Sequence, residues 1–306
     1  MKSIGTIITV LLFIQYLPFN SFAQDVVEED NTMVSYKGEK GFHLGFYLGA
    51  FFPDKDPAVV YDGYGNNSNG DKNNFASSLM YQKIRTENDP RYGFTDRIAT
   101  ELEVIHENWR FEDESYMPTN LKYNTAFLIG IAMQYGFDKR HSIIANFNFA
   151  KLKAIGNFTI ETYNSTNQTS LDWKKNQFAI VGDEQRMMIQ IGYCRILGQN
   201  EKANFFIEGG LCVNNAKVEK NFVQINSLRI DLTYFDPNVQ GASNIYYEQY
   251  TGWGFGGFAA LGLNLTMNPK YTIQLLYTPS YEKVNLGPDP TTSLQHAIGL
   301  RAYYNF

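Results

Sequence analysis

The residues that could carry acid–base or metal chemistry gather in one stretch of the chain. Four histidines occur in the sequence, and only His106 has acidic company. The carboxylates around it are Glu101, Glu103, Glu107, Glu112, Asp113 and Glu114. Such oxygen ligands suit a divalent cation, but a solvated acidic face explains the same pattern. We favour the solvated face and expect no metal site.

Catalysis by His106 would require a nucleophile beside it. No nucleophile motif accompanies this histidine, and the other three are His43, His141 and His296. We therefore expect no enzyme, no catalytic residue and no cofactor. An enzyme that uses His106 is nevertheless one hypothesis, and it predicts that His106→Ala abolishes an enzymatic activity.

A second oxygen-rich stretch, YDGYGNNSNGD, offers Asp62, Asn67, Asn69 and Asp71. It lacks the regular spacing and the terminal glutamate of a calcium-binding loop. Its glycines and asparagines predict a turn-rich loop tip instead.

Other charged and amide side chains lie inside alternating apolar runs. They are Arg186, Gln190, Glu208, Gln274 and Arg301. A buried charge needs a partner, so the role of these residues depends on the elements that contain them.

Eight runs alternate between bulky apolar residues and small or polar ones, a period of two that is typical of β-strands. Their lengths lie around the roughly 9 to 11 residues that cross a bilayer when tilted. The runs lie at about 41–53, 126–137, 143–149, 186–196, 204–214, 252–267, 271–278 and 296–306.

Short and long connections between these runs alternate strictly. The short ones are near DKRH, GQNEKA and NPK, and the long ones span about 53–121, 164–184, 219–250 and 281–292. Transmembrane barrels of the outer-membrane type have this asymmetry, whereas a soluble sandwich gives no reason for it. We predict an all-β antiparallel transmembrane barrel of about eight strands, with long outer loops. The stretch FVQINSLRIDLTYF, residues 222–235, could raise the number to ten.

Composition excludes other classes of protein. The mean hydropathy is −0.32, and no window after the first 23 residues approaches the roughly 20 apolar residues of a transmembrane helix. The 21 tyrosines and 23 phenylalanines suit strands. A net charge of −5 without a basic run argues against nucleic acid as a partner.

The N-terminus predicts export. Met1 and Lys2 precede an apolar run from Ile4 to about Leu17, and small residues follow up to Ala23. This is the pattern of a secretory signal peptide. We expect a signal peptide at 1–23, a periplasmic lead at 24–39 and a barrel at 40–306.

Aromatic residues near the strand ends predict two interfacial girdles. One contains Tyr135, Phe137, Tyr271, Tyr304 and Phe306, and the other contains Phe52 and Trp253.

The stretch HAIGLRAYYNF, with Tyr304 and Phe306 at its end, resembles the terminal assembly signal of Gram-negative outer-membrane barrels. With the signal peptide and the richness in Asn, Tyr and Phe, the chain resembles small outer-membrane barrels of the Bacteroidota, similar in plan to OmpA, OmpX and PorT. The resemblance implies an outer-membrane location, with lipids and the barrel-assembly machinery as partners. That grouping has diverse roles, and the long first loop departs from its compact members. We expect no soluble domain after the barrel, so the peptidoglycan anchoring typical of full-length OmpA-like proteins is not implied.

An eight-stranded barrel has an interior only wide enough for side chains. We therefore predict that Glu208 lies within ion-pair reach of Arg301 or Arg186. A filled lumen argues against a general porin.

The two cysteines, Cys194 and Cys212, flank one short turn, and we expect both to face inward. A hairpin centred near Asn200 places Cys194 opposite about Phe206. Because Cys212 lies several residues further along, the separation exceeds what a disulfide tolerates, and we predict free, buried thiols.

The first long loop predicts two short helices, at about 74–84 and 96–109. In the second, Ile98, Leu102, Ile105 and Trp109 share one face at helical spacing. This stripe could bind a partner or pack the loop onto the barrel rim, and we slightly favour packing.

Two functions remain after these exclusions. One is a structural or interaction barrel, such as an envelope-complex subunit or a surface-binding barrel, whose long loops contact another outer-membrane or surface protein. The alternative is a narrow channel or carrier for a small solute, because the many inward glycines and alanines could leave a cavity.

Overall fold

A computed structural model describes residues 40–306 except 68, 87, 164–172, 199, 201, 234–250 and 288–289. The expected signal peptide and periplasmic lead lie outside these residues. The strands are β1 (Gly41–Phe52), β2 (Trp109–Arg110), β3 (Lys122–Tyr123), β4 (Ala126–Gly136), β5 (His141–Thr162), β6 (Lys174–Leu197), β7 (Ala203–Ile225), β8 (Leu228–Asp231), β9 (Thr251–Asn268), β10 (Tyr271–Val284) and β11 (Thr291–Asn305). The helices are η1 (Asp56–Tyr61), η2 (Phe75–Ser77), α2 (Leu79–Arg85), η3 (Pro90–Tyr92), α3 (Arg97–Glu101) and η4 (Glu114–Tyr116).

Eight antiparallel strands form a closed ring, in the order β5-β4-β1-β11-β10-β9-β7-β6 and back to β5. The first strand pairs along nearly its whole length with the last strand, from His43 opposite Asn305 to Phe52 opposite His296. The predicted barrel of about eight strands is therefore confirmed. Residues 222–231 do form a hairpin, but β8 pairs only with β7 and adds nothing to the ring.

The bulky apolar residues of the ring point outward. Phe46, Leu211 and Phe255 are 72%, 73% and 67% exposed, whereas the inward residues of the same strands are mostly buried. A continuous belt of this kind is far larger than the apolar patches of ordinary soluble surfaces. Among the described residues, no helix has the length and apolar character needed to span a membrane.

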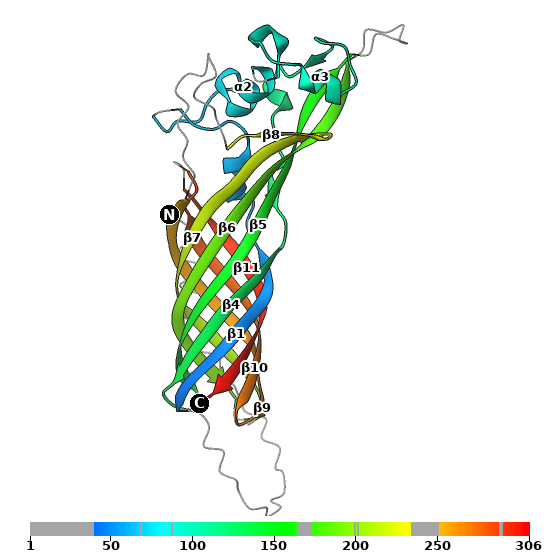
Figure 1. Cartoon of the computed structure of the whole chain (residues 1–306). Coiled ribbons are helices and arrows are strands. Elements are labelled where there is room, and N and C mark those ends of the chain that lie inside the picture. Colours follow the sequence, from blue (N-terminus) through cyan, green and yellow to red (C-terminus); the bar gives the residue numbers. More distant parts are fainter. Residues whose placement is uncertain are drawn as a thin grey trace, which may run out of the picture. The chain divides into compact units, whose positions relative to one another are not determined.

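Three neighbouring strands are about twice as long as β1 and β4. The strands β5, β6 and β7 have 22, 24 and 23 residues, against 12 and 11. They extend beyond the rest of the ring toward α2 and α3 (Figure 1). The sequence-based boundaries were wrong here, because we assigned residues such as Glu184 to a loop.

Part of the way along these long strands, the apolar residues change from the outward face to the inward face, which explains the error. On β5 the outward residues are apolar up to Phe147 and Phe149, but the next ones are Lys151 and Lys153. The inward residues beyond this point are buried and mostly apolar, namely Leu152, Ala154, Phe158 and Ile160. The alternation of a strand continues through the inversion, while the face that is apolar changes.

A second apolar core lies on the inner face of this extension. We call this region the cap; it consists of residues 62–121, β8 and the ends of β5, β6 and β7 that extend past the rest of the ring, residues 155–162, 174–181 and 219–225. Its core combines loop and strand residues, including Met80, Ile84, Ile98, Phe111, Phe158, Ile160, Ile180, Val223, Ile225 and Ile230. The end of the barrel that carries the cap is the loop end, and the end with short turns, which carries Phe306, is the turn end.

Candidate functional site

The lumen contains a buried ion pair near the turn end. Arg301 donates from Nη1 to Glu208 Oε1 at 2.6 Å and from Nη2 to Glu208 Oε2 at 3.0 Å. Both side chains are fully buried, and Nη1 also lies 3.3 Å from Gln274 Oε1. Two parallel hydrogen bonds fix the geometry of the pair. Of the two arginines considered as partners of Glu208, Arg301 is the one in contact.

Arg186 forms a separate pair closer to the loop end. It donates to Glu184 Oε1 from Nε at 2.9 Å and from Nη2 at 2.6 Å, and both side chains are fully buried. The Tyr123 hydroxyl donates to the other oxygen of Glu184. The Arg186 guanidinium also lies 5.8 Å from the ring centres of Phe51 and Tyr123.

A third carboxylate, Glu282, lies buried in the same part of the lumen. Its Oε2 accepts hydrogen bonds from Asn214 Nδ2 at 3.0 Å and from Cys212 Sγ at 3.5 Å. The sequence reasoning missed Glu184 and Glu282 because both lie beyond the apolar parts of their strands. The alternation itself continues through Glu282, so strand parity could have placed it inside the barrel.

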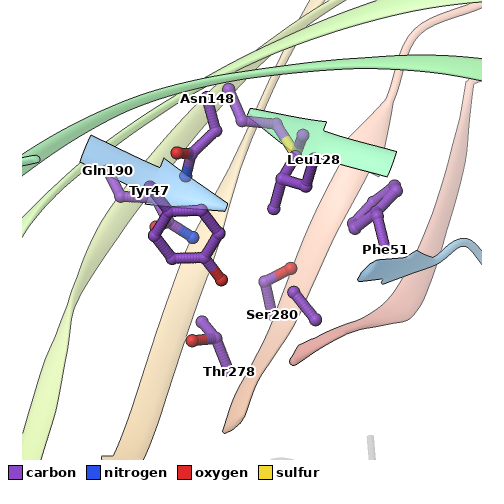
Figure 2. Close-up of a pocket in the computed structure, with 9 residues that line it drawn as sticks. Tyr47, Phe51, Leu128, Asn148, Gln190, Thr278 and Ser280 are labelled. Carbon is purple, nitrogen blue, oxygen red and sulfur yellow. The ribbon is translucent and has the colours of Figure 1, made fainter. Parts of the chain in front are cut away.

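The lumen also contains a small cavity (Figure 2). Its lining includes Tyr47, Phe51, Asn148, Thr278 and Ser280. The space open to the centre of a water molecule is ≈ 10 Å³, about what one water requires. Asn148 Oδ1 and Thr278 Oγ1 have no protein partner in the described part of the chain, so a single water fits this cavity chemically.

Aromatic rings cover glycines of the barrel wall. A Cβ atom on Gly299 would lie 2.3 Å from the Tyr47 hydroxyl, and one on Gly182 would lie 2.1 Å from the Tyr61 ring. The rings therefore occupy space that glycine alone leaves open. Tyr61 comes from η1, which packs into the barrel mouth with Ala58.

Both cysteines are free and buried, as predicted. Cys194 pairs with Glu208 across the hairpin, and Cys212 pairs with Gln190. The register is thus two residues away from the expected pairing of Cys194 with Phe206.

The predicted helix at 96–109 is wrong in length, because α3 ends at Glu101. Its four stripe residues do not share a helical face: Ile98 and Trp109 are buried in the cap core, Leu102 is half-buried, and Ile105 is 63% exposed. The other predicted helix, at 74–84, is split into η2 and α2.

Asp96 is the physical reason why the longer helix does not form. Its Oδ1 accepts from the Ala99 N–H at 2.8 Å and so caps α3, while Oδ2 lies 2.6 Å from His106 Nδ1. The Trp109 Nε1–H donates to the same carboxylate at 3.0 Å. To bring these groups together the backbone turns through positive φ at Glu103, and a straight helix could not.

The acidic residues around His106 do not converge on a metal site. Glu101 accepts from the Ser227 hydroxyl, Glu112 pairs with Arg85 at 2.9 Å, and Glu114 accepts from the Tyr64 hydroxyl. Across the described ranges, no group of three His, Cys, Asp or Glu side chains is arranged to hold a metal.

Hydrogen bonding changes the pKa values of several cap residues. The Ser227 hydroxyl and N–H lower the pKa of Glu101 below its usual 4.5. Burial, together with the hydrogen bond to Glu114, raises the pKa of Tyr64 to about 12. Both shifts reflect contacts between the cap's own parts.

The oxygen-rich stretch in the same loop forms a turn held by its own side chains. Asn67 Oδ1 accepts from the N–H groups of Asn69 and Asp71, both at 2.9 Å. Asp62 pairs with Lys72 at 2.7 Å. The side-chain oxygens of Asn67 and Asp62 are therefore bound by groups of the same stretch of chain.

The remaining histidines lie on the barrel. His43 contacts Asn305 and His141 contacts Asp138, both at the turn end, and His296 contacts the Tyr277 hydroxyl. The hydrogen bond from His141 lowers the pKa of Asp138 to about 2.

Aromatic residues cluster at the turn end. Tyr304 lies 4.9 Å from Phe306 and 5.5 Å from Tyr271 between ring centres, and Phe42 lies 6.1 Å from Phe306. The terminal aromatic residues thus lie on the outward face, where the sequence placed one girdle.

No protein-family model matches the chain, and no curated protein matches it. Solved structures with a similar arrangement include Neisserial surface protein A, at 7% identity and a TM-score of 0.40, covering 87% of this chain and 96% of that one. OprG from Pseudomonas aeruginosa has 10% identity and a TM-score of 0.40, covering 88% and 98%. Ail of Yersinia pestis has 12% identity and a TM-score of 0.34, covering 87% and 99%. At these scores the likenesses carry no argument about function.

Proposed function

We propose that this protein is an outer-membrane β-barrel that binds another component of the cell envelope through its cap. The membrane placement is supported by the outward apolar belt, because only helices and closed barrels satisfy their backbone groups in lipid. The expected signal peptide and the terminal aromatic strand fit export and insertion by the barrel-assembly machinery. The resemblance to the small outer-membrane barrels of the Bacteroidota is part of this proposal.

The observation that carries the binding role is the second core. Anchoring alone requires only the ring, yet three strands extend beyond it and support a folded cap. Buried residues such as Phe111 and Ile98 make the cap an ordered surface rather than a set of loose loops. An ordered surface lowers the entropic cost of binding a partner.

The cap also presents an apolar side chain to solvent. Ile105 is 63% exposed, and it lies between Glu103 and Glu107, whose backbones both take positive φ. Asp96 holds this turn through His106. We propose Ile105 as a contact for the partner, while Ile98 and Trp109 pack the cap internally.

The glycine-rich lumen does not favour the alternative of a solute channel. The described aromatic side chains occupy the hollows over Gly299 and Gly182, and the central cavity fits about one water. The proposed role involves no catalysis.

The test is a mild-detergent pull-down from native outer membranes, with the tag in a loop at the loop end so that Phe306 stays terminal. We expect a stoichiometric partner with the native protein, a loss of about tenfold with Ile105→Glu, and no loss with Lys139→Glu at the turn end. Recovery of the barrel alone, or equal recovery of the partner with Ile105→Glu, would contradict the proposal.

A further inference from the structure

The point at which the long strands invert marks a boundary on the outer surface. Between the pair His141–Arg195 at the turn end and this boundary, the outward residues of β5 and β6 are apolar. The last of them are Phe149 and Met187, which pair with each other. On β7, Asn215 lies opposite Met187. Asn215 also lies opposite Trp253 of β9, which belongs to one of the two predicted aromatic girdles. Aromatic residues mark the headgroup level of a membrane, so the boundary lies where lipid tails end.

Lysines occupy the first two outward rows above this boundary. One row is Lys151, Gln185 and Lys217, and the next is Lys153, Asp183 and Lys220. Strands lie about 4.8 Å apart and residues rise about 3.4 Å. The four lysine Cα atoms therefore outline an area of about 10 by 7 Å.

These lysines form no ion pair with the residues that the structure describes. Within the ranges that the structure covers, no carboxylate lies within ion-pair distance of the four ammonium groups. Nearby, Asp183 lies between two of them, and Glu219 accepts a hydrogen bond from Gln185. The cluster therefore carries four ammonium groups against two carboxylates, and this excess of positive charge favours an external anion.

We propose that Lys151, Lys153, Lys217 and Lys220 bind the phosphate groups of membrane lipids at the loop end. Phosphates lie at the level of the headgroups, directly above the apolar belt that holds the tails. One lipid can then contact Phe149 and Met187 with its chains and the lysines with its phosphate. The inference rests on the proposed membrane placement but is independent of any protein partner of the cap.

The test measures lipid binding to the purified full-length barrel in nonionic detergent by native mass spectrometry. The probes are dimyristoylphosphatidic acid, dimyristoylglycerol, which has the same tails without phosphate, and inorganic phosphate. We expect the native protein to retain phosphatidic acid at least tenfold more tightly than either of the other probes.

The decisive variant is Lys151→Gln with Lys153→Gln and Lys217→Gln. Because each lysine near a lipid surface contributes several-fold in affinity, we expect phosphatidic acid binding to weaken by about tenfold or more. The matched control, Lys139→Gln with Lys202→Gln and Lys270→Gln, removes the same charge from the turn end and should change binding less than twofold.

Equal binding of phosphatidic acid and dimyristoylglycerol would overturn the proposal, and so would equal losses in the two triple variants. Equally tight binding of inorganic phosphate would indicate a site for free anions instead of lipid. Compact migration of the unheated protein on a gel reports folding. If the patch triple variant does not fold, Lys151→Gln and Lys217→Gln are compared singly with Lys139→Gln, each with an expected loss of a few-fold.

Discussion

The lumen and the cap are both filled by side chains, but with different chemistry. In the lumen, arginine–carboxylate pairs such as Arg301 with Glu208 lie among tyrosines and amides. In the cap, a mainly apolar core is accompanied by polar contacts such as Asp96 with His106 and Glu161 with Arg110. The outer surface explains the difference. Where lipid covers the outside, apolar residues are placed outward and polar ones remain for the interior, whereas in water the same strands place apolar residues inward.

The largest effect should come from breaking the lumen pair. Arg301→Met leaves the Glu208 carboxylate buried without a cation, which costs about 3 to 5 kcal/mol. We expect the barrel in lipid vesicles to unfold at markedly lower urea concentration. Adding Glu208→Leu to the same chain should recover most of the loss. Unfolding of the single variant at the native urea concentration would show that the charge pair does not hold the lumen together.

A smaller effect should separate the two cores. Phe111 is fully buried in the cap and its ring lies 5.4 Å from Phe75 and 6.1 Å from Phe158. Phe111→Ala should cost about 3 kcal/mol and expose the cap to protease while the barrel still migrates as a compact form. Phe206→Ala, in the lumen, is the matched control and should weaken the barrel instead. Loss of the barrel with Phe111→Ala would show that the two cores fold as one.

The smallest effect should appear at the contact between α3 and the β7–β8 hairpin. The pKa of Glu101 is lowered by its hydrogen bonds to Ser227, so its contribution to stability is present above its usual pKa of 4.5. That contribution is lost as pH falls through the lowered value in the folded protein. The protection of the hairpin amides against hydrogen exchange, taken relative to the intrinsic exchange rate at each pH, should therefore fall in acid, and Glu101→Gln should remove this pH dependence. An unchanged pH dependence in Glu101→Gln would assign it to other groups.

The barrel could be predicted from the sequence because each of its strands carries its own signal. Alternation places Phe46 outward and Tyr47 inward without knowledge of any neighbour. The same parity placed Glu208, Arg301 and the two cysteines inside. The sequence could not decide whether Arg301 or Arg186 pairs with Glu208, because that depends on the register of β7. It also depends on Glu184, which lies beyond the expected end of β6 and pairs with Arg186.

The cap was less predictable. The apolar spacing from Ile98 to Trp109 favours a helix. The local pattern contains no sign of the contacts of Asp96 with His106 and Trp109, which compete with that helix. That competition exists only once the chain has turned back on itself. The long ends of β5, β6 and β7 were also missed, since a rule that requires outward apolar residues stops at Lys151.

The sequence by itself determined the fold class, a ring of about eight strands, the inward and outward faces and the free thiols, because these follow from a period of two and from connection lengths. Tertiary structure decided the pairing of the buried charges, the filling of the space over the glycines, the inversion of the long strands and the shape of the cap. Those features depend on which residues meet across strands and loops. Contacts between residues far apart in the chain leave no local pattern to read.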